Sequence, residues 1–164
     1  MKIVRASTPD HLEITSLSKL SKAYWGYSEA EMNLWEDELT VSPKFIENYA
    51  VFKLEEDQKI KGYYAVQVVD RITMEIERLF VHPDYIRQGI GYRLLNHAID
   101  FSRSVEKEII VVESDPNAKD FYEKYGFKVV GKKESLISGR FLPVMSKRIL
   151  SSRRGSIEER LKID

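Results

Sequence analysis

The stretch RLFVHPDYIRQGIGYRLLNHAIDF, at residues 78–101, indicates the fold and raises the question of function. An apolar, strand-like run ends at His82-Pro83, a short polar segment follows, and Gly89 and Gly91 open a segment with helical periodicity. Glycines at the start of a helix expose backbone N–H groups where the helix dipole is positive, which favours phosphate binding. The same residues also suit an ordinary tight turn, so the stretch alone leaves both interpretations open.

Composition restricts the class of protein. The chain has 164 residues, of which 43% are hydrophobic, enough for one globular domain with its own core. Its 26 basic residues balance its 26 acidic residues, which argues against nucleic acid or an anionic membrane surface as a partner. The absence of cysteine excludes disulfides, thiolate metal sites and a cysteine nucleophile. We therefore expect a cytoplasmic protein without a signal peptide or a membrane segment.

Hydrophobic periodicity predicts one strand, two helices, a run of strands, and then a helix, a strand, a helix and two strands. The predicted strands are 2–7, 49–54, 60–69, 73–81, 108–114, 127–131 and 141–150. Helices are predicted to begin at Thr8, Ser28, Gly89 and Asp115, and a helical turn is predicted at Ser42. The helix that begins at Ser28 is predicted to be continuous to Leu39. This order is typical of an α/β or α+β protein with a single sheet and helices on both faces. We assign residues 1–150 to one domain and 151–164 to a charged tail.

Gly89 and Gly91 depart from the patterns of two familiar nucleotide-binding motifs. A phosphate-binding loop of the nucleotide triphosphatase type needs Lys followed by Ser or Thr after the second glycine, but Tyr92 and Arg93 stand there. A dinucleotide-binding motif needs a third glycine, where this chain has Leu94, and it needs the glycines directly after the strand. Glu113 resembles the acid that binds a ribose in such folds, so a dehydrogenase remains a weaker alternative.

A third interpretation treats residues 87–92 as a backbone cradle for a pyrophosphate. Here the sequence resembles the GNAT superfamily of N-acetyltransferases at two motifs. LFVHPDYIRQGIGYRLL, at 79–95, is similar to L-x-V-x-P followed by R/Q-x-x-G-x-G/A, and NAKDFYEKYGF, at 117–127, is similar to N-x-x-A/x-x-F-Y-x-x-x-G-F. The resemblance covers Val51 to about Val130. One departure is Ile86, at a position where the family often has Arg or Gln, so the cradle relies mainly on backbone N–H groups.

The resemblance implies a single mixed, mostly antiparallel central sheet flanked by helices on both faces. It also implies that acetyl-coenzyme A is the cosubstrate of an N-acetyltransferase. The implied cofactor residues are Leu79, Phe80 and Val81 for the pantetheine arm, Arg87, Gln88, Gly89, Ile90, Gly91 and Tyr92 for the pyrophosphate, and Asn117 for the far side of the cofactor.

Acetyl transfer to an amine needs a base, because an alkyl amine with a pKa near 10.4 is protonated at neutral pH. Glu75 and Glu77 lie two residues apart on one predicted strand and so face the same side. Glu77 is the first choice because it is closer to the thioester-binding segment, Glu75 is the second, and either can act through a water. The alternative is that they face solvent or pair with Arg71 or Arg78.

The resemblance places Tyr122 at the position of the family's general acid, which protonates the departing thiolate. Without the motif, Tyr122 would be interpreted as a core aromatic beside Phe121 and Tyr125. The oxyanion would accept a hydrogen bond from a backbone N–H near Leu79 or Phe80. Because the chain has no cysteine to carry an acyl group, direct attack in a ternary complex is favoured over a covalent relay.

The acceptor is predicted to be a primary amine of a small molecule or a peptide. Candidate acceptor residues are Trp25 and Tyr27, which can stack on a cation, and Arg140, which can bind a carboxylate. Packing between helices is the plainer explanation of the two aromatics. No metal is predicted, since the three histidines lack ligand spacing, and the protein is expected to be a monomer or a homodimer. A non-catalytic acyl-coenzyme A binding module is the competing hypothesis.

Overall fold

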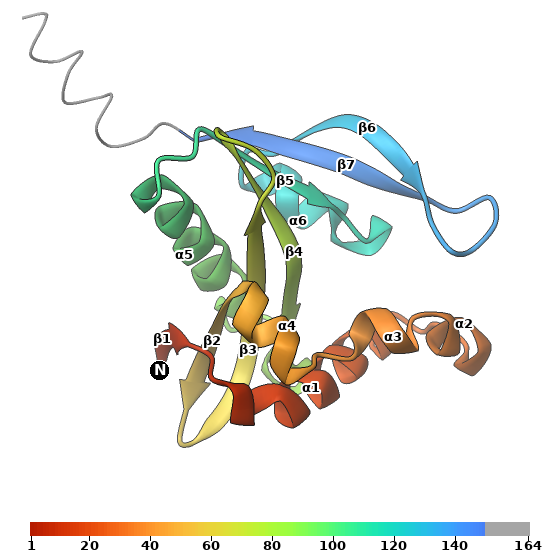
Figure 1. Cartoon of the computed structure of the whole chain (residues 1–164). Helices are drawn as coiled ribbons and strands as arrows, with labels where there is room; N and C mark the ends of the chain where they lie inside the picture. The colour runs from red at the N-terminus through yellow and green to blue at the C-terminus, as the bar shows by residue number, and fades with distance from the viewer. Residues whose placement is uncertain (150–164) are drawn as a thin grey trace, which may run out of the picture. The chain divides into compact units, whose positions relative to one another are not determined.

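The computed structural model describes residues 1–149 (Figure 1), so the predicted tail at 151–164 lies outside the described residues. The elements in chain order are β1 (Lys2–Arg5), η1 (Thr8–Asp10), α1 (His11–Ala23), α2 (Glu29–Leu34), α3 (Glu36–Leu39), α4 (Pro43–Asn48), β2 (Ala50–Glu56), β3 (Lys59–Val68), β4 (Thr73–Val81), η2 (Pro83–Tyr85), α5 (Ile90–Ser104), β5 (Ile109–Glu113), η3 (Pro116–Ala118), α6 (Lys119–Lys124), β6 (Lys128–Glu134) and β7 (Phe141–Arg148).

The strands form one seven-stranded mixed sheet in the order β1-β2-β3-β4-β5-β7-β6. The pairs β1–β2, β2–β3, β5–β7 and β6–β7 are antiparallel, whereas β4 and β5 are parallel. The parallel register runs from Thr73 opposite Ile109 to Ile76 opposite Val112, and β4 continues through Val81. The sheet confirms the predicted fold class.

The chain divides into two compact units, Met1–Val66 with Glu77–Asn96, and Gln67–Ile76 with His97 onward. In the first unit, helices α1 and α4 supply apolar side chains to one core with β2 and β3. Ser42 caps the start of helix α4, because its hydroxyl accepts a hydrogen bond from the Phe45 N–H at 3.0 Å. The predicted single domain over residues 1–150 stays a prediction.

Helix α5 packs close to β3 in the first unit because residue 62 is a glycine. A Cβ added at Gly62 would lie 2.8 Å from Leu94 Cδ1 and 3.0 Å from Ile90 Cγ2. Both of these side chains are buried on the first two turns of α5. Gly62 therefore sets how near the beginning of α5 can approach the sheet.

The second unit contains β5, β7, β6 and α6. Strand β5 lies between β4 and β7 in the sheet order, and its Ile110 and Val112 are buried. Its nearly continuous apolar sequence predicted such an interior strand correctly. None of the helices in the described part of the chain has both the length and the apolar character needed to cross a membrane.

One prediction for the helices was wrong. Residues 28–39 form two short helices, α2 and α3, rather than one, and they meet at Trp35 with φ −100° and ψ 9°. Trp35 is buried, packs edge-on against Tyr27 with ring centroids 4.8 Å apart, and carries the Lys22 ammonium 4.4 Å from its ring centroid. This packing outweighs the helical periodicity of the sequence.

Candidate active site

The loop that follows β4 has an unusual backbone. The imidazole of His82 accepts a hydrogen bond from the Asp84 N–H at 3.1 Å, which starts the short helix η2. Further on, Arg87 has φ 67° and Gly89 has φ 75°, and both residues are exposed. Two left-handed residues this close together turn the backbone sharply into α5.

The first turn of α5 presents backbone N–H groups. The Arg93 N–H donates to the Gly89 carbonyl at 3.1 Å, which is the first helical bond. The N–H groups of Ile90 and Gly91 precede that bond, where a helix offers no carbonyl four residues back. These N–H groups lie at the N-terminus of a 15-residue helix, where the helix dipole is positive, so they form a site suited to an anion.

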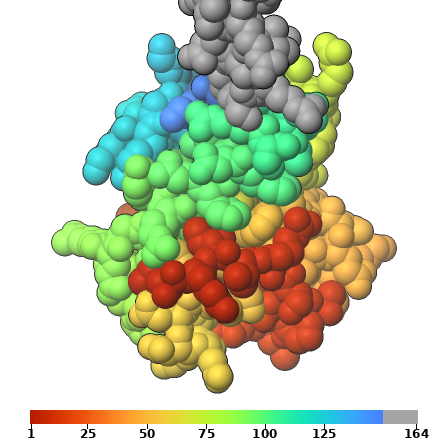
Figure 2. All heavy atoms as spheres, turned by 90° about the vertical axis from the view of Figure 1, so that its left-hand side faces the viewer, coloured from red at the N-terminus to blue at the C-terminus, as the bar shows by residue number. Residues whose placement is uncertain are grey.

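The same end of α5 is anchored to the N-terminal segment. Arg93 Nη2 donates to the Met1 carbonyl at 3.4 Å. Figure 2 shows the N-terminal segment, in red, beside the green segment that contains α5. The first turn of α5 is thus held by both β3 and the N-terminus.

The predicted pantetheine segment, Leu79 to Val81, forms the end of β4 and is half-buried. Phe80 packs against the core of the first unit, with its ring 5.9 Å from that of Tyr63. Next along the chain, the His82 N–H donates to the Lys61 carbonyl at 2.8 Å. The segment is therefore held firmly on the side of β3.

Both candidate bases lie on β4. Glu75 is half-buried, and its Oε1 accepts a hydrogen bond from Gln67 Nε2 at 3.0 Å. Glu77 is exposed and has interactions of its own. Neither carboxylate pairs with Arg78, because Arg78 takes part in no ion pair within residues 1–149.

The candidate acid Tyr122 lies on α6 in the second unit. Its side chain is 5% exposed and packs edge-on against Phe121 and Phe127, with ring centroids 5.2 and 5.3 Å away. Burial raises the pKa of Tyr122 above that of an ordinary phenol. The hydroxyl keeps its proton at neutral pH, as an ordinary phenol with a pKa near 10 also does, and the raised pKa makes it a weaker acid.

Other predicted residues of the second unit are engaged with their neighbours. The backbone and side-chain nitrogens of Asn117 donate to Asp115 Oδ1 at 2.8 and 3.0 Å. Arg140 Nη2 donates to Asp115 Oδ2 at 3.3 Å, in a pair that is largely buried. Glu113, the possible ribose ligand, forms an ion pair with Lys133 at 3.1 Å.

The two aromatic acceptor candidates differ in their surroundings. Trp25 is 46% exposed and contacts Tyr24 edge-on, with ring centroids 5.4 Å apart. Tyr27 is half-buried against Trp35 and lies under the Lys22 ammonium, 5.1 Å from its ring centroid. Tyr27 thus has the packing role that the sequence also allowed, whereas Trp25 remains available to a ligand.

Arg78, which lies between Glu77 and Leu79 on β4, was not among the site residues predicted from the sequence. Its Nη1 is the one fully buried side-chain nitrogen or oxygen that lacks a hydrogen-bond partner within residues 1–149. The sequence did show a charged residue directly before the apolar end of a strand, and a charge at such a position needs a reason. We had interpreted Arg78 only as a possible ion-pair partner of the two glutamates.

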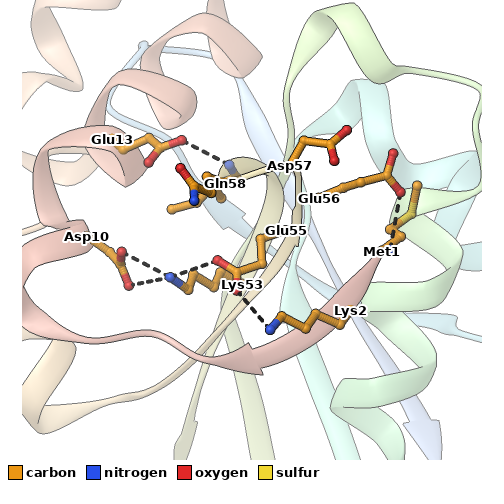
Figure 3. A pocket seen from close by; sticks show the side chains of 10 residues that line it. Met1, Lys2, Asp10, Glu13, Lys53, Glu55, Glu56, Asp57 and Gln58 are labelled. Atoms are coloured by element: carbon orange, nitrogen blue, oxygen red, sulfur yellow. Dashed lines mark hydrogen bonds and ion pairs between the residues drawn. The ribbon is translucent and has the colours of Figure 1, made fainter.

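A surface hollow of about 610 Å³ lies elsewhere on the first unit, between η1, α1 and the β2–β3 hairpin (Figure 3). Several of its charged groups pair with one another. The Lys53 ammonium lies 3.1 Å from Asp10 Oδ2 and 3.0 Å from Glu55 Oε2, and the N-terminus of Met1 lies 3.2 Å from Glu56. No group of three potential metal ligands occurs within residues 1–149.

Comparison with known proteins connects this geometry to a family. The profile of the acetyltransferase (GNAT) domain matches residues 23–146. A peptidyl-lysine N-acetyltransferase, YjaB of Salmonella typhimurium, is 35% identical over 71 residues, which are 43% of this chain and 48% of that protein. The uncharacterised N-acetyltransferase YafP of Escherichia coli is 38% identical over 65 residues, 40% of each chain. The chain thus matches about half the length of these relatives or less.

Solved structures share the fold. The PaiA N-acetyltransferase of Thermoplasma acidophilum, in complex with coenzyme A, superposes with a TM-score of 0.74 at 20% identity, over 90% of this chain and 98% of that one. The acetyltransferase yncA of Salmonella typhimurium, solved with acetyl-CoA, gives a TM-score of 0.66 at 23% identity, over 91% and 94% of the two chains.

Proposed function

The chain belongs to the GNAT family of acetyltransferases, and we propose that it transfers the acetyl group of acetyl-coenzyme A to a primary amine of a small molecule or a peptide. The observation that carries the proposal is the exposed backbone turn from Arg87 to the first turn of α5. It stands at the family's first motif and has the geometry of an anion site. Coenzyme A in the PaiA structure and acetyl-CoA in the yncA structure support the choice of cosubstrate.

The pyrophosphate would be held by the backbone N–H groups of residues 87–92, with little help from side chains. The pantetheine arm would run along Leu79, Phe80 and Val81, whose backbone can pair with its amides as a strand would. Asn117, at the family's second motif, would hydrogen-bond the cofactor. We expect no metal in this chemistry, because backbone N–H groups can hydrogen-bond to the phosphate oxygens.

Transfer then requires three proton movements. Glu77, or alternatively Glu75, would take a proton from the amine, directly or through a water. The free amine would attack the thioester carbonyl, and the oxyanion would accept a hydrogen bond from a backbone N–H near Leu79. Tyr122, at the family's second motif, would give its proton to the departing thiolate, and the attacking nitrogen would lose its second proton to solvent as the amide forms. The amine would attack in a ternary complex, without an acyl-enzyme.

A coupled test separates this enzyme from a protein that only binds acyl-coenzyme A. The protein is incubated with acetyl-coenzyme A and a panel of primary amines. Release of free thiol and the gain in mass of the acetylated amine are measured in the same reaction. We expect thiol release that depends on the amine, with intersecting initial-rate plots. Tight binding of coenzyme A without turnover on any amine would instead establish a binding module, and parallel plots would indicate an acyl-enzyme.

A further inference from the structure

Arg78 is held in place within the first unit by residues from two other elements. Its guanidinium carbon lies 4.7 Å from the centroid of the Phe45 ring, on α4. It is also close to the Tyr63 hydroxyl on β3: burial raises the pKa of Tyr63 to about 12, while the charge and hydrogen bonding of Arg78 act to lower it. A stacked arginine is more weakly hydrated than a lysine and is already ordered before a ligand arrives.

The Tyr63 hydroxyl is itself oriented. Ser18 Oγ donates to the Ile14 carbonyl at 2.8 Å, so its oxygen is free to accept from the Tyr63 hydroxyl at 2.6 Å. The phenol proton then points toward Ser18, and the lone pairs of the phenol oxygen remain for Arg78. Arg78 is thus fixed by Phe45 on one side and by this hydrogen-bond chain on the other.

This ordered cation has no anionic partner in the part of the chain described. None of the ion pairs within residues 1–149 includes Arg78, and its Nη1 is buried without an acceptor. The side chain as a whole is only half-buried, so part of it stays accessible. A buried charged donor without a partner raises the free energy of the folded protein. An anion that hydrogen-bonds to this donor would remove that cost, which favours its binding.

We propose that Arg78 binds a carboxylate of the acceptor, so that the enzyme acetylates amines that also carry a carboxylate, such as amino acids or peptides with a nearby acid. The inference rests on the proposed function. Residue 78 is close to the proposed reaction, because it directly precedes the segment assigned to the pantetheine arm and consecutive Cα atoms are about 3.8 Å apart. Since neighbouring side chains of a strand lie on opposite faces, an acceptor held by Arg78 would pass its amine proton to Glu77 through a water. The planar fork of an arginine matches a carboxylate in two parallel hydrogen bonds.

The contrast with Arg140 favours Arg78 for this role. The guanidinium of Arg140 already pairs with Asp115 at 3.3 Å, in a pair whose side chains are 17% and 15% exposed. A carboxylate approaching Arg140 would meet the charge of Asp115 as well. Arg78 has no such competitor within residues 1–149.

The test uses matched acceptors, each an amino acid and its carboxamide, which differ only in the carboxylate. For the wild-type protein we expect kcat/KM to be about tenfold to a hundredfold higher for the acid, mainly through a lower KM. Arg78→Met, which keeps the length and apolar contact of the side chain, should abolish that preference. Because each variant is compared on the same pair, differences in amine pKa between acid and amide cancel.

The matched control is Arg5→Met. Arg5 also stacks on a phenylalanine, with its guanidinium 5.0 Å from the Phe52 ring centroid, but it is exposed and lies on β1. This variant should keep the wild-type preference. If Arg78→Met does not fold, Arg78→Lys takes its place, since it keeps the charge and loses the fork, and it should retain only part of the preference.

Two results would overturn the inference while leaving the proposed function intact. One is turnover by the wild-type protein with no preference for the acid. The other is an equal loss on acid and amide in Arg78→Met, which would place Arg78 in the transfer step itself or in folding. Absence of product with every amine, despite coenzyme A binding, would refute the proposed function and the inference with it.

Discussion

Gly62 on β3 and Leu94 on α5 approach each other more closely than any other residue at position 62 would allow. A Cβ there would lie 2.8 Å from Leu94 Cδ1, and it would also lie 3.0 Å from the Phe80 carbonyl oxygen. Leu94 is fully buried, so it has little room to move away. This close approach fixes the start of α5, and hence the proposed phosphate cradle, against the end of β4.

Replacing Gly62 with alanine should therefore affect both stability and cofactor binding. We expect a loss of about 1–3 kcal/mol in the free energy of unfolding, as for other overpacked cores. Displacement of α5 should also weaken coenzyme A binding, measured by calorimetry at a temperature where the variant is folded. The control is Gly131→Ala on β6, where an added Cβ has no neighbour closer than 4.0 Å. A Gly62→Ala protein with unchanged affinity would show that the cradle does not depend on this packing.

Gly89 offers a sharper test of the cradle, because it has φ 75° and open space around a Cβ. Alanine at this position should cost about 1–2 kcal/mol of stability through backbone strain alone. Gly26 has φ 83° and equally open surroundings, so Gly26→Ala should lose a similar amount. Only Gly89→Ala should weaken coenzyme A binding, by about tenfold or more. Equal affinities for the two variants would locate the phosphate elsewhere.

The sequence predicted best those elements whose signals are local. The apolar run at 73–81 is β4, and the glycines at 89 and 91 mark the start of α5, because strand periodicity and glycine chemistry operate over a few residues. The break of the 28–39 helix was missed, since it depends on the packing of Trp35 against Tyr27 and Lys22. That packing belongs to the tertiary structure.

The candidate site was predictable to a similar extent. The motifs selected residues 87–92 and Tyr122 as candidates, but the sequence did not show that Arg140 pairs with Asp115, which is 25 residues away. Nor did it show that Arg78 lies over Phe45 and forms no ion pair within residues 1–149. Charge pairing between elements requires the folded chain, so these contacts could not be predicted from the sequence.

Tyr122→Phe removes the proposed acid while keeping the buried ring. We expect kcat to fall by about 10²-fold, as for loss of a general acid, with coenzyme A affinity nearly unchanged. Because burial raises the pKa of Tyr122, the wild-type rate should not decline on the alkaline side until above the ordinary phenol pKa near 10. Tyr125→Phe, at the end of the same helix, serves as the control and should retain wild-type kcat. An unchanged kcat in Tyr122→Phe would exclude the assigned role.

Tyr63 makes a prediction about stability at high pH. Burial raises its pKa from 10.0 to about 12 in the folded protein, with Arg78 and Ser18 acting in the opposite direction. The folded state therefore keeps a proton that the unfolded chain releases above pH ~10, so the contribution of this group is fully present below that pH and lost as pH rises toward 12. The loss should approach about 1.4 kcal/mol per pH unit in this window.

Urea unfolding of the wild-type protein and of Tyr63→Phe at several pH values measures this contribution. Near pH 8 the wild type should be more stable by about 1 kcal/mol, because Phe cannot hydrogen-bond to Ser18. That advantage should shrink above pH 10 and reverse as the pH approaches 12, since the phenylalanine has no proton to lose. A difference in stability that stays constant from pH 8 to pH 12 would mean that the Tyr63 phenol ionises as readily in the folded protein as in the unfolded chain.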